Sequence, residues 1–438
     1  MNILLIQPRL SQMQPWSFSS FLQKAVEKLM SPPLTLEQLY AITPEDYEVT
    51  IVDDRIGQKI NYNGDYDIVG ITASTAYINR AYEIADNFKK NGTKVVLGGY
   101  HPSAMPDESR QHADSVVIGE GEYSWPKLLE DVKNDTIKPF YIPDRPVDQN
   151  DIPAAKRDLT RGSYFRAPIQ ATRGCPNRCD FCCIANMKYG AIVRKRPIDH
   201  VIEEIKSIPQ KYLEFHDPSL TSHPAYAKSL FKEMKGLGKK FTCNGNIGAL
   251  YKDEELLKLA GEAGCTRWYV GFESISQDNI DDIGKKTNKI NQYLPAIKKV
   301  HDYGMVISGH FVLGLDNDTT SVFQSTLDTI NELELTSPVF HTLTPYPGTP
   351  LFDRMDKQGR ITSKDWSRYT LNEVNFKPMK MTEQELFNGV TWIKKQFYSF
   401  NNLTKITHNM EDMGHSSMLN MILTHTVSKF SYIYAGFN

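Results

Sequence analysis

The sequence predicts an α/β protein with two parallel-sheet domains followed by a helical C-terminal region. Short apolar runs alternate with amphipathic helical stretches up to about residue 355, and buried strands that alternate with helices are typical of parallel sheets. A segment rich in proline and charge, residues 139–157, interrupts the alternation and indicates an interdomain connector. We therefore expect domains at residues 1–140 and 161–355, a linker at 141–160 and a C-terminal region at 356–438.

The bulk composition argues against several classes of protein. The chain has 438 residues and a net charge of −2, which gives no electrostatic reason to expect nucleic acid or an anionic membrane as a partner. No apolar run reaches the roughly 20 residues that span a bilayer, and the N-terminus lacks the basic start of an export signal. With six cysteines, these features predict a cytoplasmic protein without a transmembrane segment.

The first domain is expected to be a doubly wound, Rossmann-like sheet. Its apolar runs span residues 3–6, 49–52, 68–71, 95–97 and 116–118. Ligands on such sheets bind at the carboxyl ends of the strands, and small residues gather there at 70–75, 98–102 and 119–122. Glycines at these places let the backbone approach a large flat ligand closely, although a generic sheet of this kind can also use glycines only for turns.

The second domain is expected to be a partial barrel of six βα units, a (β/α)6 barrel. Its predicted strands are residues 169–172, 212–216, 240–243, 267–272, 306–313 and 340–343. Its predicted helices are residues 198–207, 225–236, 254–263, 293–303 and 320–334. A full barrel has eight such units, and its chemistry lies at the carboxyl ends of the strands.

The C-terminal region is expected to be helical. Residues 383–399 form its clearest amphipathic run. Methionines 410, 413, 418 and 421 are spaced as the core of a helix would be, and we interpret them as packing residues.

Three cysteines follow the first strand of the second domain. Cys175, Cys179 and Cys182 are spaced Cys-x3-Cys-x2-Cys, and three thiolates on a 4Fe–4S cluster leave one iron free to bind a small molecule. A structural zinc site would need four tetrahedral ligands, and no further Cys or His pair of suitable spacing follows. Cys183 adjoins Cys182, so its side chain is expected to point elsewhere.

The cysteine motif, with Phe181 before its last cysteine, resembles the signature of the radical S-adenosylmethionine (SAM) family. The resemblance implies that the open iron binds the amino and carboxylate groups of SAM. It also implies that the reduced cluster cleaves SAM to a 5′-deoxyadenosyl radical. An external electron donor of flavodoxin or ferredoxin type is implied as a partner.

Polar residues at the later strand ends resemble further segments of that family. The resemblance implies SAM contacts from Phe181, Asp217, Asn244, Glu273, Ser274 and Gly314. Glu273 would contact the ribose or the amino group of SAM. Pro218 and Asn246 depart from the family, which often has Asp and Arg there. Taken singly, carboxylates such as Glu273 more often lie on the surface, and His216 and His310 more often have structural roles.

The glycine-bearing loops of the first domain, in this order, resemble the cobalamin-binding domain that precedes many radical SAM domains. The resemblance implies that the corrin or its nucleotide tail is bound by Ser74, Thr75, Gly98, Gly99, His101, Gly119, Glu120 and Gly121. The Asp-x-His-x-x-Gly motif that supplies a cobalt ligand in some cobalamin proteins is absent. We therefore expect cobalamin without a histidine ligand from that motif.

Together, these resemblances imply a cobalamin-dependent radical SAM methyltransferase that transfers a methyl group from methylcobalamin to an unactivated carbon. One alternative uses cobalamin for cyclisation, ring contraction or hydration without methyl transfer. Another is a non-catalytic corrinoid or redox sensor. A methylthiotransferase is disfavoured, because no cysteine precedes Cys175. The substrate, a small molecule or a protein side chain, is left open, and no residue is assigned a catalytic role.

Overall fold

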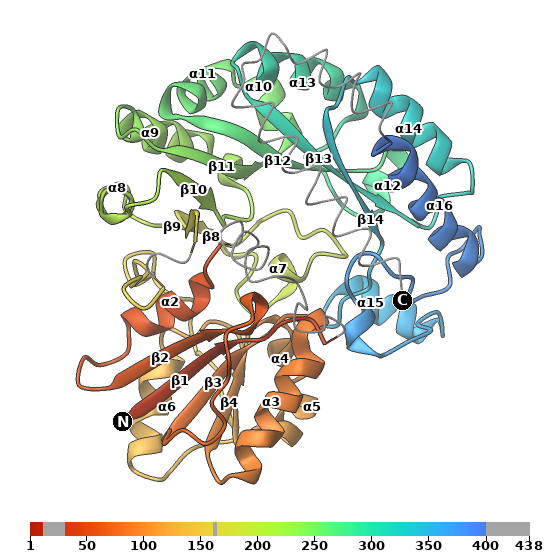
Figure 1. Ribbon diagram of the computed structural model, residues 1–438. Coiled ribbons are helices and arrows are strands. Elements are labelled where there is room, and N and C mark those ends of the chain that lie inside the picture. The colour runs from red at the N-terminus through yellow and green to blue at the C-terminus, as the bar shows by residue number, and fades with distance from the viewer. Residues whose placement is uncertain (12–30, 161–163, 400–438) are drawn as a thin grey trace.

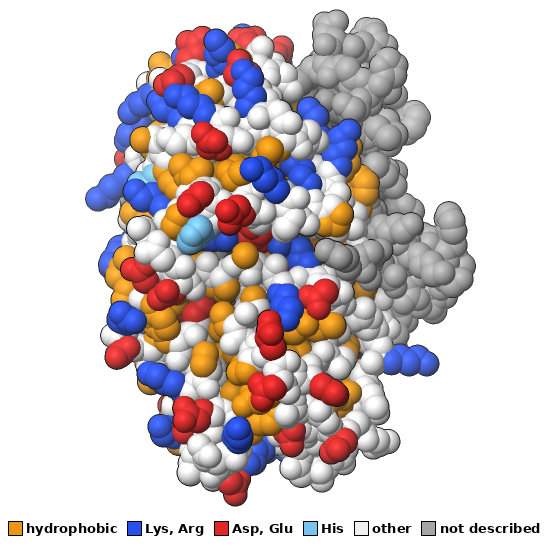
Figure 2. Space-filling view, turned by 90° about the vertical axis from the view of Figure 1, so that its left-hand side faces the viewer, with side chains coloured by type: hydrophobic (Ala, Val, Ile, Leu, Met, Phe, Trp, Pro, Cys, Tyr) orange, Lys and Arg blue, Asp and Glu red, His pale blue; other side chains and the backbone are white. Residues whose placement is uncertain are grey.

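The computed structural model describes residues 1–11, 31–160 and 164–399. Methionines 410, 413, 418 and 421 lie outside these residues, so their expected packing stays a prediction. Within the described ranges, two six-stranded parallel sheets stand one above the other, each with helices packed on it (Figure 1). No helix in these ranges is long and apolar enough to cross a membrane. Acidic and basic side chains are interspersed over the face seen in Figure 2.

The first sheet has the strand order β2-β1-β3-β4-β5-β6. Its strands are β1 Asn2–Gln7, β2 Glu48–Asp53, β3 Ile68–Thr72, β4 Lys94–Gly98, β5 Ser115–Val117 and β6 Phe140–Tyr141. All pair in parallel. The five expected strands are present, and β6, two residues long, adds a sixth that has no apolar run to reveal it.

Helices cover both faces of this sheet, as the doubly wound prediction requires. They are α2 Leu34–Ala41, α3 Ile78–Lys90, α4 Tyr100–Ala104, α5 Pro106–His112 and α6 Ser124–Lys133. On one face, Leu36 and Trp125 from α2 and α6 pack with Leu5. On the other, Ile78 from α3 packs with Val69.

The second sheet has the order β14-β13-β12-β11-β10-β7. Its strands are β7 Arg166–Ile169, β10 Tyr212–Phe215, β11 Lys240–Gly245, β12 Cys265–Glu273, β13 Val306–Leu313 and β14 Ser337–Thr342. All pair in parallel. The sheet curves into an open barrel with helices on its outer face (Figure 1). The six-stranded partial barrel is therefore present as predicted.

The helices of this domain include three short ones that the sequence pattern did not reveal, α7, α10 and α12. They are α7 Cys183–Asn186, α8 Ile198–Ser207, α9 Pro224–Met234, α10 Ile247–Lys252, α11 Glu254–Ala263, α12 Gln277–Asp282, α13 Tyr293–Asp302 and α14 Val322–Glu332. Single turns of 3-10 helix are η1 Asp54–Ile56, η2 Thr75–Tyr77, η3 Leu220–Ser222, η4 Ile290–Gln292 and η5 Trp366–Arg368.

The first barrel strand lies earlier than predicted. The expected strand 169–172 is instead β7 Arg166–Ile169, and the chain leaves the sheet after Ile169. Residues 172–173 form β8 (Thr172–Arg173), which pairs antiparallel with β9 (Arg194–Lys195). The physical reason is a side chain: Asp217 accepts the N–H groups of Ala171 and Thr172, which removes these residues from the sheet ladder.

The region after the barrel connects both domains. It contains α15 Pro350–Lys357, η5 and α16 Glu383–Phe397, and α16 packs against α14 and β14. Phe352, Trp366 and Tyr369 are buried in the same cluster as the α3 face of the first sheet. The Trp366 indole N–H also donates to Glu108 on α5 at 2.8 Å. The expected boundary at residue 355 is not tested by these contacts and stays a prediction.

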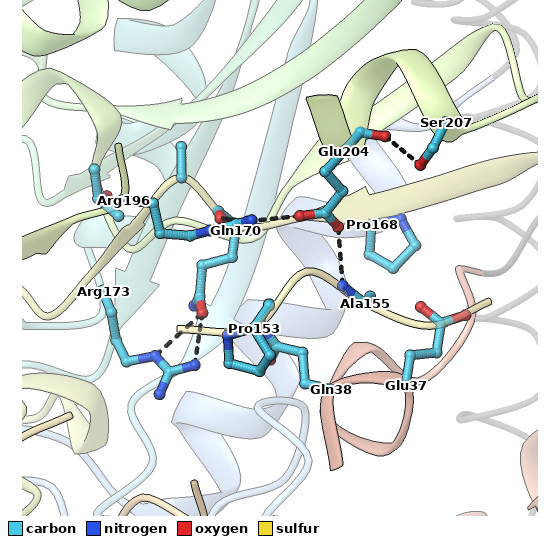
Figure 3. A network of polar contacts seen from close by, with 12 residues as sticks. Glu37, Gln38, Pro153, Ala155, Pro168, Gln170, Arg173, Arg196, Glu204 and Ser207 are labelled. Atoms are coloured by element: carbon cyan, nitrogen blue, oxygen red, sulfur yellow. Dashed lines mark hydrogen bonds and ion pairs between the residues drawn. The ribbon is translucent and has the colours of Figure 1, made fainter. Parts of the chain in front are cut away.

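The connector is fixed by buried charges (Figure 3). Glu204 on α8 accepts from Arg157 Nη2 at 2.7 Å and from Arg196 Nη1 at 2.6 Å. Arg157 also donates to the carbonyl of Pro168 in β7 at 2.6 Å. The connector's Thr160 hydroxyl donates to Glu37 on α2 at 2.5 Å. One stretch of connector is therefore bonded to both domains.

We predict that Glu204→Ala destabilises the fold by about 3–5 kcal/mol, because it removes the carboxylate partner of the buried Arg196 and leaves the buried Arg157 with only Glu37, at 3.7 Å. The side chains of Arg157 and Arg196 are only 10% and 2% exposed. Urea denaturation should show a lower midpoint at an unchanged slope. The matched control is Glu203→Ala, an exposed glutamate on the same helix, with an expected change within about 0.5 kcal/mol. Equal midpoints for the two variants would contradict this account.

Candidate functional site

The three cysteines lie on a loop whose course depends on glycine. The loop runs between β8 and β9, and the Cys175 N–H donates to Gly190 O at 2.9 Å. Gly174 has φ +89°, and a Cβ there would overlap Ile192 O. A Cβ on Gly190 would overlap Ile184 O. Only residues without a side chain therefore let the loop close on itself.

The thiols of the loop influence one another's ionisation. The pKa of Cys179 is raised to about 12, mainly by burial, with smaller increases from the charges of Glu273, Cys182 and Cys175 and a decrease from Lys285. Burial also raises the pKa of Cys182, which interacts with Cys175. Cys183 interacts with Cys182, its chain neighbour, and with Tyr100 and Tyr346. Three soft thiolates gathered on one loop are the donor set that a 4Fe–4S cluster requires.

Across the described ranges, no three His, Cys, Asp or Glu side chains form a group that could hold one ion.

Glu273 and Lys285 form a buried ion pair beside the cysteines. Their side chains are 8% and 13% exposed. Although burial opposes its charge, the pKa of Lys285 is raised by the charges of Glu273, Cys179 and Cys182. Lys285 could not be found from the sequence, because nothing in the local pattern distinguishes it from Lys286 beside it.

The backbone at Glu273 is strained. Its φ of +62° lies in the left-handed region, which non-glycine residues seldom adopt and which is concentrated at functional sites. The pairing of β12 with β13 is irregular at the same point, between Gly271 and Glu273. A Cβ on Gly271 would overlap the Glu273 carboxylate and come within 2.6 Å of Lys285 Nζ. The strand end is therefore shaped around this carboxylate.

Asp217 is occupied by the chain itself. It is fully buried, and its carboxylate accepts from Ala171 N at 3.1 Å, from Thr172 N and from Thr172 Oγ1 at 2.6 Å. Burial raises the pKa of Asp217 to about 6. Asn244 Nδ2 donates to the Asp217 carbonyl at 2.8 Å. Both residues thus hold the turn that leads into the cysteine loop.

The other predicted SAM contacts lie at two neighbouring strand ends. The Gly314 N–H donates to Asp318 Oδ2 at 2.9 Å, and Asn279 Nδ2 donates to Asp318 Oδ1 at 2.7 Å. Asn279 Nδ2 also lies 3.3 Å from Ser274 Oγ. Phe181 is half-buried against the barrel core. The Asn279–Asp318 link, which joins the ends of β12 and β13, was missed because no single motif contains both residues.

A cavity of about 730 Å³ lies between the two domains. Six residues predicted for cobalamin line it: Ser74, Gly98, Gly99, Gly119, Glu120 and Gly121. Thr75 and His101 are not among its lining residues. His101 is fully buried, and its ring nitrogens lie 3.4 Å from Thr75 Oγ1 and 3.3 Å from Glu108 Oε1. The structure therefore does not bring these two residues to the cavity.

The cavity fits a large flat group lying against backbone. Gly99 has φ +100°, and a Cβ there would come within 2.7 Å of Ala73 O. A residue with a side chain therefore does not fit at this strand end. The opposite wall includes Ile184, Met187 and Gly190, which follow Cys182 on the cysteine loop.

An ion-pair clamp joins the two walls. Glu120 accepts from Arg194 Nη1 at 2.7 and 2.6 Å and lies 3.5 Å from Arg173 Nη1. Glu122 accepts from the same Arg173 nitrogen at 2.6 Å. Both arginines belong to the β8–β9 hairpin that carries the cysteine loop. Glu120, predicted as a cobalamin contact, therefore also sets the distance between the two domains.

Comparisons with known proteins identify this pair of domains. The chain matches the family models of the Radical SAM superfamily, over residues 169–330, and of the B12 binding domain, over residues 33–129. Bacteriochlorophyllide d C-12(1)-methyltransferase from Chlorobaculum tepidum is 32% identical over 383 residues, or 84% of this chain and 83% of that relative. The chain belongs to the cobalamin-dependent radical SAM methyltransferases. Its cofactors are a 4Fe–4S cluster, SAM and cobalamin.

Further similarities agree with this family. Bacteriochlorophyllide d C-8(2)-methyltransferase from the same organism is 33% identical over 77% of this chain and 78% of its own length. The fold matches that of the cobalamin-dependent SAM radical enzyme OxsB, with a TM-score of 0.71, 15% identity, and coverage of 99% of this chain and 72% of that one. It also matches TsrM from Kitasatospora setae, with a TM-score of 0.67, 18% identity, and coverage of 82% and 76%. The family predicted from the cysteine motif and the glycine loops is confirmed.

We predict that Asp217→Ala lowers both stability and iron content. The substitution leaves three buried donors without an acceptor, and each costs about 1–3 kcal/mol. Asp217→Asn keeps one acceptor oxygen and should retain more iron. Iron per chain after anaerobic reconstitution and the urea midpoint measure the effect. If Asp217→Ala reconstitutes fully but binds SAM weakly, then Asp217 contacts SAM and does not hold the turn.

Proposed function

We propose that this enzyme methylates an unactivated carbon of a tetrapyrrole with the methyl group of methylcobalamin. The two relatives at 32% and 33% identity are both named for methylating bacteriochlorophyllide d, which supports a tetrapyrrole as substrate. A relative at 25% identity is named hopanoid C-2 methylase, from Rhodopseudomonas palustris. A polycyclic lipid is therefore the alternative to test.

The shared cavity is the observation that carries the proposal. Gly98 and Gly99, at a strand end of the B12-binding sheet, and Ile184, just after the last cysteine of the motif, border the same space of about 730 Å³. A methyl donor held by the first wall and a radical source held by the second would therefore act within one enclosure. Fixed proximity of this kind is a large contribution to rate.

We propose that Cys175, Cys179 and Cys182 hold the cluster and that Glu273 and Lys285 hold SAM. When bound, the cluster with SAM supplies the 5′-deoxyadenosyl radical, and cobalamin supplies the methyl group. Glu273 and Lys285 present a carboxylate beside an ammonium, which complements the amino and carboxylate groups of SAM. Charge-assisted hydrogen bonds to such groups contribute about 1.5–3 kcal/mol each.

Two further expectations belong to this proposal. An external flavodoxin or ferredoxin would reduce the cluster, since no other redox cofactor is implied. All six cysteines are free thiols, which is compatible with the reducing cytoplasm predicted from the sequence.

The proposed function is tested with the reconstituted, reduced enzyme, SAM and bacteriochlorophyllide d. We expect 5′-deoxyadenosine, S-adenosylhomocysteine and a product heavier by one methylene. Deoxyadenosine without S-adenosylhomocysteine would favour cyclisation or another reaction without methyl transfer. Formation of neither product would favour a sensor. Methylation of a hopanoid in place of the tetrapyrrole would replace the proposed substrate.

We predict that Cys183→Ala keeps the iron content and visible absorbance of the reconstituted protein, whereas Cys179→Ala loses most of both. The reason is that Cys179 belongs to the Cys-x3-Cys-x2-Cys motif and interacts with Cys175 and Cys182, whereas Cys183 lies outside the motif spacing. The two variants are matched, because each removes one thiol of the same loop. The opposite pattern of iron loss would refute the ligand assignment.

A further inference from the structure

The inner face of the barrel is polar. On β12, Trp268, Val270 and Phe272 are buried in the hydrophobic core, which the outer helices share. Because side chains alternate along a strand, Arg267 and Tyr269 lie on the opposite, inner face. This face is the concave side of the curved sheet in Figure 1.

Arg267 on this face is buried without a counter-ion. The residue is 8% exposed, and its Nη1 donates a hydrogen bond to the neutral Ser337 Oγ at 3.2 Å. No carboxylate in the described ranges forms an ion pair with it. Burial lowers the pKa of Arg267, Tyr269 raises it and Arg166 lowers it, yet a guanidinium stays protonated in proteins. Because buried arginines are almost always paired, an anion bound here would complete the site.

Its neighbours add an unused hydrogen-bonding group, whereas the carboxylate on the next strand already has other partners. Thr242 on β11 is the register partner of Arg267, and its Oγ1 is buried without a partner. The next strand places Glu214 beside Thr242. That carboxylate already accepts from the Ser31 hydroxyl at 2.5 Å and lies 3.7 Å from His216 Nε2. Glu214 is therefore engaged elsewhere.

A second unsatisfied group lies farther along the same face, toward Glu273. His310 on β13 follows the inner-face position of Ser308, and its Nε2 is buried without a partner. Its Nδ1 lies 2.9 Å from His341 Nε2. Three groups on one wall thus have bonding capacity to spare. Among the described residues, the Arg267 guanidinium has no carboxylate partner, and Thr242 Oγ1 and His310 Nε2 have no hydrogen-bond partner.

We propose that Arg267 and Thr242 bind a carboxylate of the substrate inside the barrel. This proposal rests on the methyltransferase function proposed above and names a substrate feature. The planar guanidinium fork matches a carboxylate in a bidentate geometry, and the Thr242 hydroxyl can donate a further bond. Arg267 precedes Glu273 by six positions on one strand, which is about 20 Å at about 3.3 Å per residue. The substrate is therefore a large molecule with an acidic group far from the reacting carbon.

The test uses sodium propionate as a carboxylate probe and propionamide as its neutral counterpart, on the holoenzyme with cluster and cobalamin. Propionate should raise the thermal midpoint of the wild type, and propionamide should not. In Arg267→Gln, the propionate concentration needed for the same shift should rise at least about 10-fold, since a charged hydrogen bond is lost. Thr242→Val should weaken the response in the same direction. Arg368→Gln, a partly exposed arginine paired with Glu373, is the control and should respond as wild type does.

Two outcomes would overturn the proposal. The first is an equal propionate response in wild type and Arg267→Gln. The second is a large fall in the thermal midpoint of Arg267→Gln without propionate. The arginine would then stabilise the fold through its hydrogen bond to Ser337. Removing an unpaired buried charge should instead leave the midpoint unchanged or higher.

Methylation of bacteriochlorophyllide d by the wild type, measured in parallel, separates the two proposals. If propionate acts through Arg267 but no tetrapyrrole is methylated, the proposed substrate fails and the carboxylate site stands. If the tetrapyrrole is methylated and propionate acts equally on the variant, the site fails and the function stands.

Discussion

The clamp between Glu120 and the arginines of the β8–β9 hairpin is the constraint on which the rest of the site depends. One domain provides the carboxylate and the other provides Arg194 and Arg173. All three side chains are at most 16% exposed, so removing one partner would leave a charge both desolvated and unpaired. Since the hairpin carries the cysteine loop, the clamp sets how far the cluster side of the cavity lies from the B12-binding strand ends.

Two other contacts between the domains hold the same geometry. The connector is bonded on one side to Glu37 and on the other to Glu204. The chain after the barrel returns to the first domain, where Trp366 packs in its core and donates to Glu108. Three separate attachments resist rotation of one domain against the other. A reaction that moves a methyl group between separately bound cofactors depends on such fixed distances.

Within this frame, the backbone at the end of β12 is strained. Glu273 adopts a left-handed conformation beside a glycine whose position admits no side chain. Such conformations cost about 1–3 kcal/mol and persist only where the surroundings enforce them. Here the enforcing contacts are the ion pair to Lys285 and the bonds from Asn288 Nδ2 to the carbonyls of Gly271 and Phe272. The same strand carries Arg267 six positions earlier, so one strand presents both a carboxylate and a cation to the barrel interior.

The sequence by itself determined the features that depend on local pattern. Alternating apolar runs revealed both parallel sheets, because burial on two faces requires such runs. The cysteine spacing predicted a cluster loop, because three thiols on one loop lie close in the chain. Only the tertiary structure decided the contacts between distant positions. Lys285 beside Glu273, Glu120 against Arg194, the early end of β7 at Asp217 and the inward position of His101 each depend on segments far apart in sequence. Such partners are selected by electrostatic attraction and burial in the folded protein. The local sequence pattern around each residue therefore does not predict them.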